Sequence, residues 1–210
     1  MNELVALLAA YLLGAIPFGL LAGRLKGVDL RTLGSGNIGA ANAFRNLGRA
    51  WGVGVMAGDI GKGVAGAVIG RWLTDDPWPI FVGAAVMLGA IFPVWLRFRG
   101  GKGVAAGGGV IIGLFPIVGL CLLPLWLLIV VIARITSLAS ILTAAAFTPL
   151  AFVFGYSWPY LVLAGAMSLL VIVRHRANIG RLLAGQEARI ELRKKSPRTP
   201  AATPPPAPRA

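Results

Sequence analysis

The feature that most constrains this chain is its succession of long uncharged segments. Residues 4–23 read LVALLAAYLLGAIPFGLLAG without a charge, and residues 103–133 are also uncharged. A helix needs about 20 apolar residues to cross the hydrocarbon core of a bilayer. A signal peptide does not fit the first segment, which lacks a basic start and a small-residue cleavage site followed by a polar domain. The pattern predicts an all-α integral membrane protein.

The composition supports this class. Hydrophobic residues make up 57% of the chain and charged residues 13%, against about 25% charged in soluble domains. On a membrane protein, a net charge of +13 reports orientation and contact with anionic lipid headgroups, so no nucleic-acid partner is expected. The single cysteine, Cys121, excludes a disulfide within the chain and a cysteine-based metal site. We expect no metal and no cofactor.

The distribution of charge predicts the topology. The loops at 24–50, 97–102, 134 and after 174 are basic and are expected in the cytoplasm, whereas 71–79 is acidic. All basic loops share one side only if the run 103–133 divides into two helices near the sequence LFPIVG. The prediction is seven transmembrane helices, with the N-terminus outside and the C-terminus cytoplasmic. A kinked re-entrant pair would satisfy the same count. The expected spans are 4–23, 51–70, 80–96, two within 103–133, 138–154 and 159–173.

The chain divides into two parts by composition. Residues 1–193 form the predicted transmembrane domain. Residues 194–210, KKSPRTPAATPPPAPRA, are rich in proline and have no apolar periodicity, so a disordered cytoplasmic tail is expected.

Four polar stretches are predicted to meet on the cytoplasmic face: GSGNIGAANAFR, RFRGGKG, RITSLAS and RHRANIGRLLAGQE. Glycines let backbone N–H groups approach an anion closely, and Lys and Arg neutralise its charge. This mixture predicts a site for one or more phosphate groups. The candidate residues are Ser35, Asn37, Asn42, Arg45, Gly101, Lys102, Gly103, Ser140, His175, Asn178 and Arg181.

Each stretch also has a simpler interpretation. GGKG lacks the spacing of a nucleotide-binding P-loop, and residues 97–102 alone would serve as a positive-inside anchor. The hydroxyls at 136–140 would suit a helix cap, and the arginines after 173 a stop-transfer signal. Within an apolar span, Asp59 and Lys62 are three residues apart and are expected to pair and hold helices together. For Glu187 a structural salt bridge to an arginine is expected.

In order and spacing, SGNIGAANAFR, RFRGGKGVA, RITSLAS and HRANIGRLLAGQE resemble the motifs of the bacterial acyl-phosphate:glycerol-3-phosphate acyltransferases, from about Gly14 to Glu187. This resemblance implies a seven-helix enzyme of the bacterial inner membrane with its active site facing the cytoplasm. Such an enzyme moves a fatty acyl group from acyl phosphate to the 1-hydroxyl of sn-glycerol 3-phosphate. The chain has Ala41, Ala106 and Ala90 where the family pattern carries Thr, Thr and His, so His175 is its only imidazole.

The resemblance also implies roles for matching residues. The glycine loop 101–103 would hold phosphate, and Glu187 would maintain the fold. The residues implied to line the substrate site are Ser35, Arg45, Lys102, Ser140, His175, Asn178 and Arg181.

Acyl phosphate is a reactive mixed anhydride, so we expect direct transfer without an acyl-enzyme. Arg45, Lys102 and Arg181 would bind phosphates, and His175, Asn178 and Ser35 form the predicted catalytic set. Either His175 or a phosphate oxygen of the donor would accept the hydroxyl proton.

Expected partners are the two substrates, the bilayer and the soluble enzyme that makes acyl phosphate. A membrane transporter of an organic phosphate is the alternative function, because it would also carry basic, glycine-broken helices. An acyl-CoA-dependent acyltransferase fits the sequence less well, because His175 does not begin an H-x-x-x-x-D motif.

Overall fold

The computed structural model describes residues 2–190, and within that range every regular element is helical. The tail predicted over 194–210, and the last residues assigned to the domain 1–193, lie outside the described residues. The helices are α1 (Asn2–Gly14), α2 (Phe18–Leu25), η1 (Leu30–Thr32), α3 (Ala40–Asn46), α4 (Arg49–Leu73), α5 (Trp78–Ile91), η2 (Val94–Leu96), α6 (Val104–Leu114), α7 (Pro116–Ala133), α8 (Thr136–Val153), α9 (Trp158–Arg174) and α10 (Arg176–Leu183).

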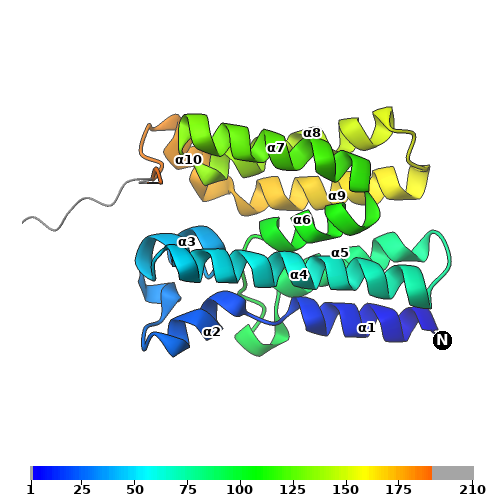
Figure 1. The fold of residues 1–210 in the computed structure, drawn as a ribbon, viewed down its shortest axis with the longest axis horizontal. Coiled ribbons are helices and arrows are strands. Elements are labelled where there is room, and N and C mark those ends of the chain that lie inside the picture. The colour runs from blue at the N-terminus through cyan, green and yellow to red at the C-terminus, as the bar shows by residue number, and fades with distance from the viewer. Residues whose placement is uncertain (1, 191–210) are drawn as a thin grey trace, which may run out of the picture.

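The helices form two layers (Figure 1). In the first layer α4 packs against α1, α5 and α6, and in the second α8 packs between α7 and α9. The α6–α7 connection joins the layers, and α5 touches α9 across them. The short helices α2, α3 and α10 gather at one end, opposite the α4–α5 loop. This end carries the polar stretches.

Five helical segments are long and apolar enough to cross a membrane: α1 with α2, α4, α5 with η2, α7 and α8. A sixth is reached if α9 and α10, which bend by 57°, are taken as one span. Helix α6 has 11 residues and is therefore about 17 Å long, roughly half the thickness of the hydrocarbon core. The helical membrane architecture is confirmed, and a count of seven requires α6 as a short span.

The uncharged run 103–133 divides into two helices, as the sequence predicts. Helix α6 ends at Leu114 and α7 begins at Pro116, where the missing proline N–H is tolerated in the first helical turn. The two helices fold back on each other and pack closely. A Cβ atom added to Gly119 on α7 would lie 3.4 Å from Cα of Ile112 on α6. Pro124 lies within α7 and does not end it.

The run 4–23 differs from the expected continuous span. It breaks between Gly14 and Phe18, because proline disfavours helical geometry in the preceding residue. Nζ of Lys62 donates a hydrogen bond of 3.0 Å to the carbonyl of Ile16 at this break. Helix α5 likewise ends at Ile91, before Pro93, so the span expected over 80–96 finishes in a short 3-10 turn.

Glycines bring α4 and α6 into close contact. A Cβ atom added to Gly63 would lie 2.1 Å from the carbonyl oxygen of Ala106, and one added to Gly109 would lie 2.1 Å from that of Ile60. Small residues of this kind allow membrane helices to approach closely. The contact holds the start of α6 against the middle of α4.

The layers meet in an aromatic cluster away from that end. The buried ring of Phe115 lies 4.9 Å from the ring of Phe147 and 4.6 Å from that of Tyr156, measured between centroids. Tyr160 on α9 also donates a 2.7 Å hydrogen bond to Asp76 in the α4–α5 loop. The layers are therefore joined at the end opposite the polar stretches.

Candidate active site

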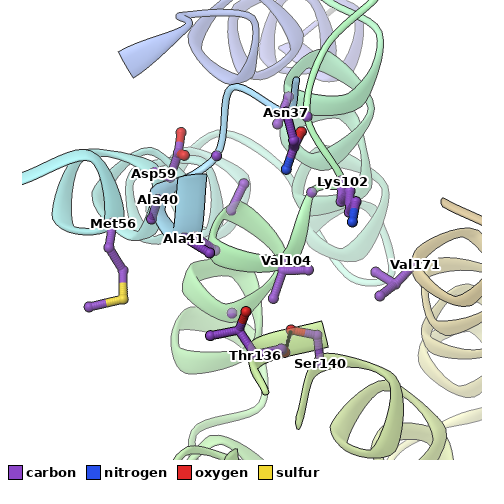
Figure 2. Close-up of a pocket in the computed structure, with 18 of the residues that line it drawn as sticks. Asn37, Ala40, Ala41, Met56, Asp59, Lys102, Val104, Thr136, Ser140 and Val171 are labelled. Atoms are coloured by element: carbon purple, nitrogen blue, oxygen red, sulfur yellow. Dashed lines mark hydrogen bonds between the residues drawn. The ribbon is translucent and has the colours of Figure 1, made fainter. Parts of the chain in front are cut away.

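A cavity of about 910 Å³ opens between the two layers. In Figure 2, Asn37 and Lys102 lie on one side of it and Thr136 and Ser140 on the other. All the candidate residues named from the sequence border this cavity. They are Ser35, Asn37, Asn42, Arg45, Gly101, Lys102, Gly103, Ser140, His175, Asn178, Arg181, Glu187, Asp59 and Lys62.

Glu187 accepts hydrogen bonds from three side chains. Its carboxylate is bonded at 2.7 Å by Oγ of Ser137, at 2.7 Å by Nε of Arg181, and also by the amide of Asn178. Burial raises the pKa of Glu187, but these three donors together lower it below its ordinary value. The carboxylate is therefore ionised at neutral pH. The expected salt bridge to an arginine is present, with Arg181.

Lys102 extends this network into the other layer. Its Nζ donates to Oδ1 of Asn178, whose amide nitrogen donates to Glu187. Burial lowers the pKa of Lys102 to about 8; Glu187 opposes this shift, and Arg181 adds to it. Lys102 is therefore a cation at neutral pH, but one that loses its charge unusually easily.

The glycine loop ends at the start of α6. Gly103 adopts a left-handed backbone conformation (φ 75°), and a Cβ atom there would lie 2.7 Å from Cδ1 of Ile91. Gly103, Val104 and Ala105 border the cavity. The first N–H groups of a helix have no partner within it, so this end of α6 beside Lys102 favours an anion.

Asn42 holds the loop that precedes α3. Its amide nitrogen donates to the carbonyls of Leu30 (3.1 Å) and Leu33 (3.0 Å). Its Oδ1 accepts the N–H of Ser35 at 3.2 Å and the amide of Asn46 at 2.9 Å. Both ends of the buried Asn42 amide are hydrogen-bonded to other groups of the protein. This favours a role for Asn42 in shaping the loop over direct contact with substrate.

His175 lies at the bend between α9 and α10 and is 3% exposed. Its Nδ1 is 2.8 Å from the carbonyl oxygen of Val171. A carbonyl only accepts hydrogen bonds, so Nδ1 carries the proton and Nε2 keeps its lone pair. Burial lowers the pKa of His175 to about 4, so the ring is neutral at pH 7.

Sequence reasoning missed two contributors to this site. The hydroxyl of Ser140 donates to the carbonyl of Thr136 (2.8 Å) and accepts from Nε1 of Trp126 (3.2 Å). Trp126 lies in the uncharged run that forms α7. Its indole N–H, a polar group in an apolar segment, is the only feature of the sequence that could have marked it as a contributor. Ser137 was one of several hydroxyls in its stretch, and nothing in the sequence distinguished it as the partner of Glu187.

The ion pair expected between Asp59 and Lys62 is present, with Oδ1 and Nζ 2.7 Å apart. Within residues 2–190, no three His, Cys, Asp or Glu side chains lie close enough together to hold a metal ion.

Together, fold and site define a helical membrane protein with a cationic pocket that continues into an apolar chamber. A family model described as glycerol-3-phosphate acyltransferase matches residues 4–185. The chain belongs to this family of membrane acyltransferases.

Its relatives support the assignment. A glycerol-3-phosphate acyltransferase of Caulobacter vibrioides is 42% identical over 98% of this chain and 94% of its own, and one from Geobacter sulfurreducens is 44% identical over 91% and 99%. The crystal structure of PlsY (YgiH), an integral membrane glycerol 3-phosphate acyltransferase in its glycerol 3-phosphate form, superposes with a TM-score of 0.87. That chain is 42% identical, over 91% of this chain and 96% of its own. Its lysophosphatidic acid form gives a TM-score of 0.84 at 41% identity, over the same shares of the two chains.

Proposed function

We propose that this protein transfers a fatty acyl group from acyl phosphate to the 1-hydroxyl of sn-glycerol 3-phosphate. The products are lysophosphatidic acid and inorganic phosphate, in the first acylation step of phospholipid synthesis. The observation that carries this proposal is the continuity of the cavity. Arg45, Lys102 and Arg181 border its polar part, and apolar side chains such as Ile111 and Leu122 border the rest. A charged headgroup and an acyl chain each find a matching environment there.

The cationic groups have a surplus of positive charge. Glu187 is the carboxylate that bonds Arg181 and, through Asn178, reaches Lys102. Two substrates that each carry a phosphate would supply the missing negative charge. The start of α6 adds backbone N–H groups that would suit the phosphate group of acyl phosphate.

The reaction needs little from the protein beyond placement. The 1-hydroxyl oxygen attacks the acyl carbonyl carbon, the bond from that carbon to the phosphate oxygen breaks, and phosphate leaves with the bonding electrons. Lys102 and the α6 N–H groups would neutralise the charge that develops on the leaving group. Ser35 and Asn37 border the same space and would orient the glycerol hydroxyls.

The hydroxyl proton has two candidate acceptors. With a pKa of about 4, His175 is a weaker base than a phosphate oxygen, whose second pKa is about 6 in phosphate monoesters. We therefore assign the proton to a substrate phosphate oxygen. His175 borders the cavity, and its Nε2 would accept a hydrogen bond from the 2-hydroxyl of glycerol 3-phosphate and so position this substrate.

The proposal includes the topology. With α6 counted as a short span, α1–α2, α4, α5, α6, α7, α8 and α9 cross the bacterial inner membrane seven times, with the N-terminus outside. The basic end that carries α2, α3 and α10 then faces the cytoplasm, from which glycerol 3-phosphate would enter the cavity. The soluble enzyme that makes acyl phosphate would meet the same face.

Phosphate release by the purified protein tests this proposal, with palmitoyl phosphate as donor, with and without glycerol 3-phosphate. We expect release that requires glycerol 3-phosphate and does not occur when palmitoyl-CoA replaces the donor. Turnover with palmitoyl-CoA alone would overturn the proposed donor. A folded protein that binds glycerol 3-phosphate without turnover would favour transport, which uptake into liposomes would then measure.

A further inference from the structure

Arg174 does not border the cavity, yet it contacts the loop that forms part of its wall. Its Nη2 donates to the carbonyl oxygens of Gly100 at 3.3 Å and Gly101 at 3.1 Å. Its guanidinium carbon lies 5.7 Å from the centre of the Phe92 ring. Arg174 ends α9 and the glycines precede α6, so this contact joins the two layers.

The other side of the same loop is held by α5. The N–H of Gly100 donates to the carbonyl of Ile91 at 3.0 Å, and that of Gly101 donates to Ala90 at 3.1 Å. The N–H and the C=O of both glycines are therefore engaged, the N–H by α5 and the C=O by Arg174. A glycine backbone would otherwise sample many conformations.

The contact is poorly explained by stability alone. Nε of Arg174 is buried without a hydrogen-bond partner among the described residues, which has an energetic cost. No carboxylate pairs with this guanidinium in the part of the chain that the structure describes. Its bonding partners are the two glycine carbonyls, and the next residue in the chain is His175.

We propose that Arg174 is a positioning residue for phosphate binding, an inference that rests on the function proposed above. By holding the carbonyls of Gly100 and Gly101, it sets the direction of the following residue, Lys102, and of the first turn of α6. Since His175 follows Arg174 directly, the same contact fixes the separation between the glycine loop 101–103 and the imidazole. The ligand is the phosphate group of either substrate.

The test compares the full-length protein with Arg174→Gln, Arg174→Lys and the control Arg176→Gln. Arg176 is an exposed arginine two residues further along, so its removal changes the charge without touching the loop. The thermal unfolding midpoint of each protein in detergent is measured at increasing concentrations of inorganic phosphate. The rise of the midpoint reports binding without turnover. KM is then measured separately for glycerol 3-phosphate and for palmitoyl phosphate, which distinguishes the two sources of phosphate.

We expect Arg174→Gln to weaken phosphate binding about tenfold, because the loop loses the two charge-assisted hydrogen bonds that hold the carbonyls of Gly100 and Gly101. Arg174→Lys should be intermediate, because an ammonium lacks the planar fork of donors. Arg176→Gln should stay within about twofold of the wild type. KM should rise for the substrate whose phosphate the loop holds and change little for the other.

The proposal is overturned if Arg174→Gln binds phosphate as the wild type does, or if both Gln variants weaken it equally. If Arg174→Gln does not fold, Arg174→Lys decides by the same comparison, since it keeps the charge. A wild-type protein that shows no phosphate stabilisation would also overturn it. Absence of turnover in a wild type that binds phosphate would instead contradict the proposed function and leave the phosphate titration to decide the role of Arg174.

Discussion

Two lysines, Lys62 and Lys102, lie against the same cavity in very different surroundings. Lys62 pairs with Asp59 at 2.7 Å and donates to the carbonyl of Ile16, so its charge is balanced within the protein. Lys102 donates to Asn178, a neutral amide, and has Arg45, Arg174 and Arg181 within electrostatic reach. The negative charge of Glu187 favours the charged form of Lys102 and partly offsets the effect of these arginines.

The difference separates a structural charge from a binding charge. A buried cation whose partners are complete has nothing to offer a ligand, and removing either partner leaves the other exposed to a desolvation cost. A cation that is short of negative charge gains from an incoming phosphate. Lys62 should therefore act on the stability of the protein, and Lys102 on its activity.

The largest effect is expected from Lys102→Met. Loss of this charge should lower kcat/KM by about 10³-fold, as removal of one donor to a developing negative charge commonly does. The unfolding midpoint should move by only a few degrees. The assay is phosphate release, with Arg99→Gln as the control, since Arg99 is an exposed cation in the same loop. A variant with near wild-type kcat/KM would remove Lys102 from the site.

The second comparison uses Lys62→Met. Asp59 would be left without its partner and the carbonyl of Ile16 without its donor, so stability should fall by about 3 kcal/mol. Activity per folded molecule should change only a few-fold. Chemical unfolding of Lys62→Met, Asp59→Asn and the double variant forms a cycle. Additive losses would show that the pair is not coupled.

The pH profile should distinguish Lys102 from other groups. Its pKa of about 8, lowered by burial, means that it is charged below that pH and neutral above it. The kcat/KM of the free enzyme should therefore fall by up to about tenfold per pH unit above 8. In Lys102→Arg this alkaline limb should disappear, because arginine stays charged. An unchanged limb in that variant would assign it to another group.

The smallest effect is expected from Trp126→Phe. It removes the indole N–H that bonds Ser140 but keeps an aromatic wall, and the Ser140 hydroxyl retains its bond to Thr136. One neutral hydrogen bond is worth about 1 kcal/mol, so kcat/KM should fall by about fivefold. Trp95→Phe, at an exposed position, is the matched control. Equal losses in both variants would argue against a specific role for the indole.

Most of the fold follows from local features of the sequence. Uncharged runs of about 20 residues predict the spanning helices, and Pro116 marks the division of the run 103–133. The break at Pro17 was missed because hydropathy averages over the residues around it. The unwound carbonyl of Ile16 is tolerated there because Lys62, 46 residues later, supplies a donor.

The sequence by itself determined the residue types at the predicted site, because phosphate binding needs cations beside flexible glycines, and only a few stretches of so apolar a chain combine the two. It could not show which of them bond to one another. Ser137 reaches Glu187, 50 residues later, because α8 and the segment after α10 pack together, and Arg174 reaches Gly100 and Gly101 because the two helical layers pack together. Such contacts join residues far apart in the chain, and their geometry depends on packing that no local pattern encodes.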